Sequence, residues 1–264
     1  ERLPSESHLV LGSAFAPAVI DELPTTAWRT VISNPPYVRY QRSARADSRV
    51  PRIPSSLEIR QNLMETIDLL DALDTTDKRL FRAMAHGYSG LADLAVPSWI
   101  LCAGLVEVGG TLGMLVPTTW LSRDYAHPIR YMLHRWFELG CVVEDGDATW
   151  FPDALVRTAL VVAKRVPRRE SAFSASPDSG YTHVRLEQQL ANGRSLVAGL
   201  YPGERDADLA LGRDIKKRCA PKLVARWVPT APDQRALCDA VSEQAWLKPL
   251  ESVTPPNGTS APHP

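Results

Sequence analysis

The sequence predicts an open α/β sheet with helices on its faces, and three observations support this fold class. Short apolar runs that end at proline or glycine alternate with helical periodicity through residues 28–163. The composition is typical of a globular chain, with 44% hydrophobic and 23% charged residues. No apolar run reaches the roughly 18 residues of a membrane span, so no membrane partner is expected.

Each predicted element depends on the spacing of its apolar residues and on the residue that ends it. Strands are apolar runs stopped by proline or glycine, whereas helices carry apolar residues every three or four positions. The predicted strands cover residues 9–12, 28–33, 111–116, 141–144 and 157–163. The predicted helices cover residues 76–86, 92–107 and 127–139, together with a helix that has Leu63, Ile67 and Leu70 on one face. The pair Gly109-Gly110 is expected to stop the helix at 92–107.

The pattern changes after Lys164, where the apolar periodicity weakens and prolines become frequent. We therefore predict a boundary near Val166, with one region over residues 1–165 and a second over 166–253. Residues 254–264 are rich in Pro, Gly, Ser and Thr and are predicted to be a disordered tail.

The charges and cysteines restrict the function classes. With 30 basic and 30 acidic residues the formal net charge is zero, which excludes binding to nucleic acid by bulk charge but leaves room for local basic patches. The cysteines are far apart and form no CxxC pair, so they predict free thiols in a reducing, cytoplasmic compartment. They are Cys102, Cys141, Cys219 and Cys238. The six histidines are scattered, and no metal site is expected.

The strongest motif for chemistry is Asn34-Pro35-Pro36-Tyr37, directly after the apolar strand at 28–33. Ligands of open α/β sheets bind at the carboxyl ends of strands. The Asn34 side-chain carbonyl and the Pro35 backbone carbonyl are two acceptors that can hold both hydrogens of a planar –NH2 group. They favour a pyramidal nitrogen whose lone pair can attack an electrophilic methyl group. Tyr37 supplies a ring face for stacking.

Residues 33–39 (Ser-Asn-Pro-Pro-Tyr-Val-Arg) resemble motif IV of the S-adenosylmethionine-dependent N6-adenine DNA methyltransferases. The resemblance is to the gamma-class enzymes of type II restriction–modification systems in particular. Residues 109–121 resemble the family's fifth strand and the loop after it, and residues 150–162 resemble motif VIII. The three segments follow in the family's order, and the resemblance as a whole covers roughly residues 9–165. They imply a class I methyltransferase (Rossmann-like) open sheet, incomplete at its N-terminal side, in which residues 166–253 start a target-recognition region.

The resemblance also implies roles for individual residues. Asn34 and Pro35 would bind the target amino group, within a rigid tetrad completed by Pro36, and Tyr37 and Phe151 would sandwich a flipped adenine. Arg39 is assigned to substrate binding. The exocyclic amine would attack the methyl group directly, so no cysteine nucleophile is needed.

S-adenosylmethionine is the cofactor that the resemblance implies. Residues 92–94 (Ala-Asp-Leu) resemble motif V and assign Asp93 to the cofactor pocket. Residues 11–15 resemble motif III and assign Ser13 and Ala14, with Ser13 standing where the family commonly has an acidic residue. The family's glycine-rich cofactor turn lies upstream of this tetrad and has no counterpart here. We therefore expect an N-terminally truncated chain that does not bind the cofactor alone.

Two groups of cations are candidate DNA contacts, with double-stranded DNA as the expected partner and a restriction or specificity subunit as a possible second one. The first group follows the tetrad and comprises Arg39, Arg42, Arg45, Arg49, Arg52 and Arg60. The second comprises Arg213, Lys216, Lys217, Arg218, Lys222 and Arg226. A solvated loop and a solvated helix face are the alternative interpretations.

Two other functions stay open. Protein-glutamine methyltransferases of release factors also use Asn-Pro-Pro-Tyr, because a glutamine amide is likewise a planar –NH2 group. The segment around Trp150 and Phe151 and the basic insert after Tyr37 favour a nucleobase instead. A non-catalytic DNA-binding subunit or fragment is the third interpretation, favoured by the missing glycine turn.

Overall fold

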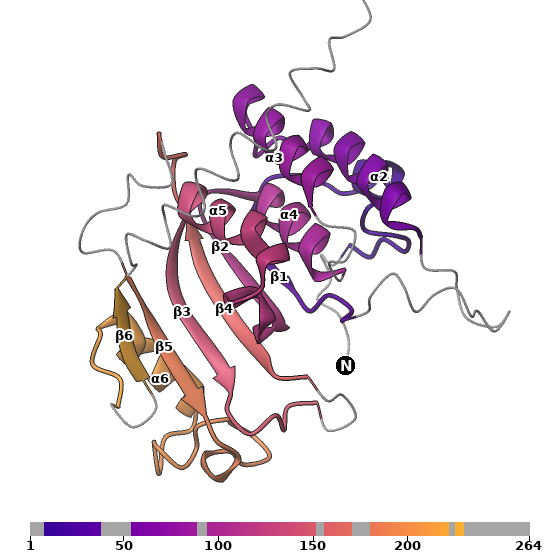
Figure 1. Cartoon of the computed structure of the whole chain (residues 1–264). Coiled ribbons are helices and arrows are strands. Elements are labelled where there is room, and N and C mark those ends of the chain that lie inside the picture. Colours follow the sequence, from indigo (N-terminus) through magenta and orange to yellow (C-terminus); the bar gives the residue numbers. More distant parts are fainter. Residues whose placement is uncertain are drawn as a thin grey trace, which may run out of the picture.

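Six strands form one mixed sheet in the order β1-β2-β4-β3-β5-β6 (Figure 1). The computed structural model describes residues 8–37, 54–88, 94–151, 156–170, 180–221 and 225–229. The strands are β1 (Trp28–Ser33), β2 (Val106–Pro117), β3 (Phe137–Asp145), β4 (Thr158–Arg165), β5 (Gly180–Leu186) and β6 (Ala225–Pro229). The β1–β2 and β3–β5 pairs are parallel, whereas β4 is antiparallel to both β2 and β3, and β6 is antiparallel to β5.

Helices cover both faces of this sheet. The α-helices are α1 (Pro17–Asp21), α2 (Ser56–Leu69), α3 (Thr75–Gly87), α4 (Ala95–Leu105), α5 (His127–Trp136) and α6 (Ala207–Lys216). Short 3-10 turns are η2 (Thr118–Leu121), η3 (Asp124–Ala126) and η4 (Gln188–Leu190). Figure 1 shows α2 to α5 gathered beside β1 and β2, and α6 beside β5 and β6. In the described part of the chain, no helix is long and apolar enough to cross a membrane.

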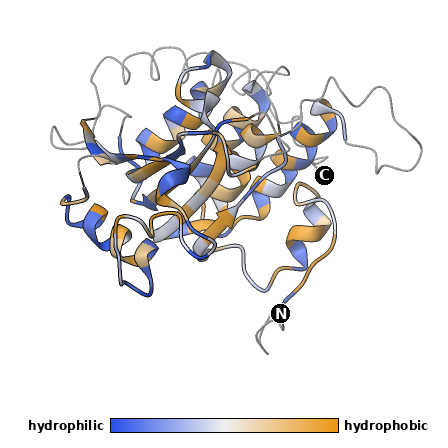
Figure 2. Cartoon of the chain, turned by 90° about the horizontal axis from the view of Figure 1, so that it is seen from below, coloured by the Kyte–Doolittle hydropathy of each residue, from blue (hydrophilic) through white to orange (hydrophobic). Residues whose placement is uncertain are grey.

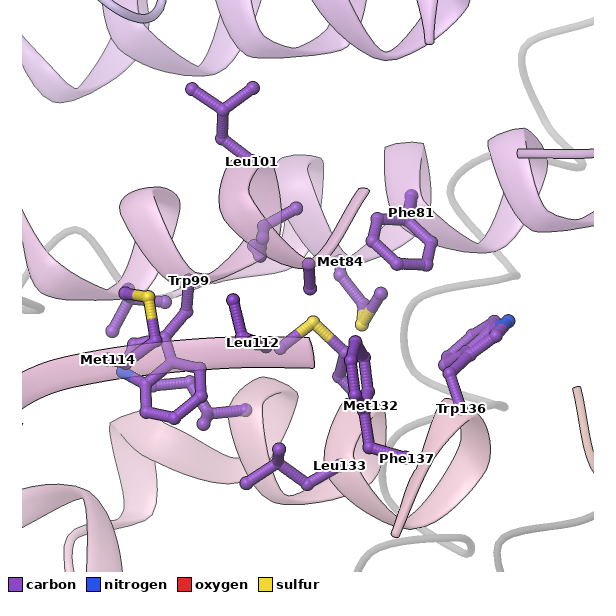
Figure 3. Packing of buried hydrophobic residues seen from close by; sticks show 14 of the residues in the cluster. Phe81, Met84, Trp99, Leu101, Leu112, Met114, Met132, Leu133, Trp136 and Phe137 are labelled. Carbon is purple, nitrogen blue, oxygen red and sulfur yellow. The ribbon is translucent and has the colours of Figure 1, made fainter. Parts of the chain in front are cut away.

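Alternation along the strands sends neighbouring side chains into two separate hydrophobic clusters. Val142 and Val161 join the larger cluster under α2 to α5, whereas Val143 and Leu160 contact the smaller cluster under α6. Figure 3 shows the larger cluster, in which α3, α4 and α5 contribute side chains around Leu112 of β2. Hydrophobic colour runs through the central strands in Figure 2, while the helices show both apolar and polar residues. The sheet therefore has a buried centre on both faces.

Most predicted elements are present. The strand predicted at 28–33 is β1, and those predicted at 111–116, 141–144 and 157–163 lie within or closely match β2, β3 and β4. The helix with Leu63 and Ile67 is α2, in which both side chains are fully buried. The helix predicted at 76–86 is α3, which begins at an Asp74 cap. The mixed α/β fold class with an open sheet is thus confirmed.

The strand predicted at 9–12 is wrong, because residues 8–12 pair with no other strand in the described part of the chain. The Leu9 and Leu11 side chains are 71% and 84% exposed. An apolar run forms a strand only when a neighbouring strand takes its backbone hydrogen bonds, and none of the described strands does so here.

Two helices end earlier than predicted, and each passes directly into a strand. α4 ends at Leu105 with β2 beginning at Val106, and α5 ends at Trp136 with β3 beginning at Phe137. The pair Gly109-Gly110 therefore lies inside β2 rather than at the helix end. Gly109 has a φ of +89°, and a Cβ on Gly110 would lie 2.9 Å from the Arg29 carbonyl oxygen. These glycines allow the irregular start of the β1–β2 pairing, where the register shifts between Trp28 and Thr30.

The sheet continues past the boundary predicted near Val166. β5 pairs with β3 over five residue positions, and β6 pairs with β5. These two strands were not predicted, although residues 181–186 alternate between polar and apolar side chains. The assignment of 166–253 to target recognition stays a prediction, and the tail at 254–264 lies outside the described residues.

Candidate active site

The predicted tetrad leaves the sheet at the carboxyl end of β1, directly after Ser33. β2 runs parallel beside β1 and ends at Pro117. β4 is antiparallel to β2 and places Thr158 opposite Pro117, so the chain before β4 returns to this same end of the sheet. The topology thus brings Asn34–Tyr37 and Phe151 together where open α/β sheets bind ligands.

The Tyr37 hydroxyl is the polar centre of the site. Its oxygen lies 2.8 Å from Asn34 Oδ1 and 3.1 Å from the Leu115 carbonyl oxygen of β2. Burial raises the pKa of Tyr37 to about 12, so the group stays protonated and acts as a donor at neutral pH. Asn34 and Pro36 are exposed while Pro35 between them is buried, which anchors the tetrad and leaves the Asn34 amide at the surface.

Tyr37 and Phe151 are in direct contact. Their ring centroids are 6.0 Å apart and the ring planes meet at 89°, an edge-to-face arrangement. A base between two parallel rings separates them by about 7 Å, because each carbon–carbon contact takes about 3.5 Å. The structure brings these two aromatic residues together, but they contact each other and leave no slot between them.

Asp145 at the end of β3 positions the turn that carries Phe151, and the sequence analysis missed it. The residue is 2% exposed, and its Oδ2 accepts a hydrogen bond of 2.7 Å from the Trp150 backbone N–H. The same turn is fixed by the Gly146 N–H, which donates to the Leu186 carbonyl oxygen at 2.8 Å. An acidic residue at the end of an apolar strand was the only signal in the sequence.

The turns after β2 form the wall beside the site. Arg130 of α5 donates from Nη1 to the carbonyl oxygens of Trp120 and Arg123 at 2.8 and 3.0 Å, and the Thr119 and Tyr125 hydroxyls lie 2.7 Å apart. The cavity enclosed by this wall and α4 has a volume of about 10 Å³. That volume holds one water molecule, which excludes an organic ligand there.

The residues assigned to the cofactor are only partly described. Ser13 and Ala14 are exposed in the segment before α1, which is held to α2 by a hydrogen bond from Thr66 Oγ1 to the Phe15 carbonyl oxygen. Among the described residues, no hydrogen bond joins either of them to the tetrad. Asp93 lies outside the described residues. The described segment therefore offers a Ser13 hydroxyl but no carboxylate at 11–15 for the amino or hydroxyl groups of a nucleoside, which fits S-adenosylmethionine only in part.

The two basic groups also differ in what the structure describes. Arg39, Arg42, Arg45, Arg49 and Arg52 lie outside the described residues. Arg60 is engaged internally, because it donates to the Tyr88 carbonyl oxygen and stacks 4.7 Å from the centroid of the Tyr88 ring. Arg213 and Lys216 are exposed on α6, and the one acid among them, Asp214, accepts a hydrogen bond from the Tyr201 hydroxyl. The α6 cations are thus the better placed for an external anion.

Metal and disulfide chemistry have no described site. No group of three or more metal-ligating side chains occurs in the described ranges. Cys102, Cys141 and Cys219 are free thiols, and burial raises the pKa of both Cys102 and Cys141 to about 11. Cys102 and Cys141 are therefore poor nucleophiles at neutral pH.

Comparison with known proteins gives no family assignment. No family model and no curated protein matches the chain. It is similar to the methyltransferase subunit of a type I restriction–modification system from Streptococcus thermophilus, with 12% identity, a TM-score of 0.48, and coverage of 84% of this chain and 38% of that one. It is also similar to a Listeria monocytogenes protein assigned as a class I S-adenosylmethionine-dependent methyltransferase, with 11% identity, a TM-score of 0.41, and coverage of 76% and 46%. A type I restriction–modification assembly matches with 15% identity, a TM-score of 0.37, and coverage of 92% and 40%.

The chain spans less than half the length of each of these solved structures. The function proposed below rests on the geometry of the site and on the motifs of the sequence.

Proposed function

We propose that this chain carries the acceptor site of a DNA methyltransferase, which transfers a methyl group from S-adenosylmethionine to N6 of a flipped adenine. One observation carries the proposal. At the carboxyl end of β1, Asn34 Oδ1 accepts a hydrogen bond from an aromatic O–H donor whose ring packs on Phe151. An adenine N6–H group has the same elements, a planar ring with a polar hydrogen at its edge.

The proposed mechanism uses two fixed acceptors. The Asn34 Oδ1 and the Pro35 carbonyl oxygen would each accept one hydrogen of the amino group. They would thereby orient the nitrogen lone pair away from the ring and hold it ready for in-line attack. S-adenosylmethionine, when bound, would supply an electrophilic methyl group on a sulfonium, whose carbon–sulfur bond breaks as the carbon–nitrogen bond forms and leaves a neutral thioether. The amine then releases one proton, so that the product is a neutral N6-methyladenine.

Extrusion of the base has an energetic cost that the aromatic residues offset. Taking an adenine out of the duplex costs a few kcal/mol. Stacking on an aromatic side chain returns about 1–3 kcal/mol per base contact. Tyr37 and Phe151 together are therefore sufficient to hold an extrahelical base, provided that their rings become parallel.

The test is a methyl-transfer assay with the full-length protein that carries this chain. Labelled S-adenosylmethionine is offered with double-stranded DNA and, separately, with a release factor. We expect label in DNA, and digestion of that DNA to nucleosides should yield N6-methyladenine. The Asn34→Ala variant should lose transfer while keeping its affinity for DNA, because it removes an acceptor without changing the surrounding surface.

Two results would reject this function. Label on the release factor alone would assign the site to a glutamine amide. DNA binding without transfer to either substrate, in a protein that binds S-adenosylmethionine, would indicate a non-catalytic subunit. A restriction or specificity subunit remains a proposed partner, and co-purification with the product of a neighbouring gene would test it.

A further inference from the structure

Tyr37 occupies the position that the proposed function gives to the substrate. Its hydroxyl hydrogen-bonds the same Asn34 Oδ1 that would accept the adenine amino group. Its ring also meets the ring of Phe151 edge to face, and Phe151 is the residue that would stack on the base. One side chain therefore fills both the polar and the aromatic half of the site.

The geometry excludes a base while Tyr37 keeps this arrangement. The rings are perpendicular at 6.0 Å, so neither an adenine nor any other planar ring fits between them. One of the two rings has to turn before both can stack on a base. A turn of Tyr37 takes its hydroxyl away from the oxygens of Asn34 and Leu115 together, because both contacts depend on the position of the same oxygen.

We propose that Tyr37 is an intramolecular latch, which mimics the substrate in the resting site and becomes a stacking platform when an adenine displaces it. This inference rests on the proposed function and adds the order of events at the site. The incoming N6–H replaces the Tyr37 O–H at Asn34 Oδ1, and the base enters between the two rings as they become parallel. A planar aromatic donor in the resting site also favours a nucleobase over the aliphatic amide of a glutamine.

The latch predicts an unusual effect of removing a hydrogen bond. Tyr37→Phe keeps the ring but deletes the hydroxyl. It therefore removes the one donor that the Asn34 and Leu115 oxygens share in the resting state, and it removes no hydrogen bond of the loaded state. Loss of a neutral hydrogen bond changes an equilibrium by roughly three- to tenfold. The variant should therefore bind the target base more tightly than the wild-type protein, and its KM for DNA should fall by about three- to tenfold.

The experiment uses the full-length protein and a duplex with 2-aminopurine in place of the target adenine. The fluorescence of 2-aminopurine rises when the base leaves the stack, so the DNA-dependent signal measures the extrahelical population. We expect half-saturation at a three- to tenfold lower concentration for Tyr37→Phe. KM is also measured on the adenine duplex, where it should fall by the same three- to tenfold.

Two control variants separate the latch from other roles. Tyr201→Phe deletes a hydroxyl that hydrogen-bonds Asp214 of α6. It should change neither the concentration at half-saturation nor the KM for DNA. Tyr37→Leu removes the latch and the platform together, and it should weaken binding of the target base. Unchanged or weaker binding by Tyr37→Phe would overturn the latch, even if the wild-type protein methylates adenine. Absence of methylation by the wild-type protein would instead reject the proposed function.

Discussion

Asp145 shows how a single buried carboxylate places a side chain elsewhere in the chain. Its Oδ2 accepts the Trp150 N–H at 2.7 Å, and the residue after Trp150 is Phe151 of the candidate site. The carboxylate is 2% exposed, so water does not replace this bond when it is lost. Asp145 is therefore a positioning residue for the aromatic half of the site.

Asp145→Ala should destabilise the turn and displace Phe151. A buried backbone donor without its acceptor costs about 1–3 kcal/mol of unfolding free energy. Denaturant titration would measure this loss, and the single-turnover methylation rate should fall with it. The matched control is Asp147→Ala in the same turn, whose exposed carboxylate accepts the Gln188 N–H at 3.0 Å. We expect the control to change stability by at most about 0.5 kcal/mol, and an equal loss in both variants would contradict the role of Asp145.

Asp74 gives the chain a pH-dependent helix cap. It begins α3, and the pKa of its carboxyl is lowered, first by the hydrogen bond from the Asp77 N–H and then by Arg168. A carboxyl whose pKa is lower in the folded state adds stability above its unfolded pKa, and this stability is lost as the pH falls through the folded pKa.

Asp74→Ala should therefore cost about 1 kcal/mol at pH 7, as loss of an N-cap does. The difference in unfolding free energy between wild type and variant should shrink as the pH falls from about 5 to 2. Denaturant titrations at several pH values would measure it. A difference that stays constant across this range would show that the Asp74 charge has no part in the cap.

At the scale of elements, the sequence was sufficient where a stripe of apolar residues and a stop signal coincide. α2, with Leu63 and Ile67 on its buried face, and β1 before Pro35 are examples. The sequence was insufficient where the secondary structure of a segment depends on another segment packing or pairing against it. Residues 9–12 are apolar but pair with none of the described strands, and Gly109 lies at an irregularity inside β2 rather than at the end of a helix.

In the candidate site, too, some features could be predicted from the sequence and others could not. The order of the motifs predicts that the tetrad and Phe151 share one site, and the strand topology returns both segments to one edge of the sheet, while the roles of these residues stay predictions. The bonds of Tyr37 to Asn34 and to Leu115 were not predictable, since the first depends on side-chain orientation and the second joins residues 78 positions apart. Asp145 was missed because its function is to bind a backbone N–H, which leaves no sequence pattern.

A buried ion pair joins the helical layer to the sheet. Arg165 of β4 is 1% exposed, and its guanidinium donates to Asp77 Oδ2 of α3 at 3.2 Å and to the Ala103 and Val106 carbonyl oxygens. Asp77 also accepts the Trp136 indole N–H at 2.9 Å. The Arg165–Asp77 pair thus connects α3, α4, α5 and β4 through its hydrogen bonds.

Asp77→Ala should destabilise the fold by about 3–5 kcal/mol, because it leaves the Arg165 charge buried without its partner. Asp68→Ala is the matched control, since the Asp68–Arg82 pair between α2 and α3 is partly exposed to solvent and contributes about 0–1 kcal/mol. Denaturant unfolding of the two variants would measure both values. Similar losses in both would show that the α3 packing, rather than the buried charge, depends on Asp77.

At the scale of the whole molecule, the two faces of the sheet are covered by different helices. α2 to α5 lie over the larger cluster, and α6 lies over the smaller one on the opposite face, with exposed cations near its end (Figure 1). A chain with zero net charge attracts DNA only through such local groups. We therefore expect the DNA affinity to depend on which surface carries a given charge.

Arg213→Glu on α6 should weaken DNA binding, because each phosphate contact releases a counterion and adds about 0.9 to the slope of log K against log salt concentration. The slope of log K against log salt concentration should fall in magnitude by about 1. The affinity for DNA near 0.15 M salt should fall by about fivefold. Arg79→Glu is the matched control, since Arg79 is an exposed cation on α3 of the other surface. Binding titrations of the full-length variants at several salt concentrations would give both slopes. Equal slopes for Arg213→Glu and wild type would show that α6 does not contact DNA. An equal loss of affinity in both variants would show that only the net charge of the protein matters.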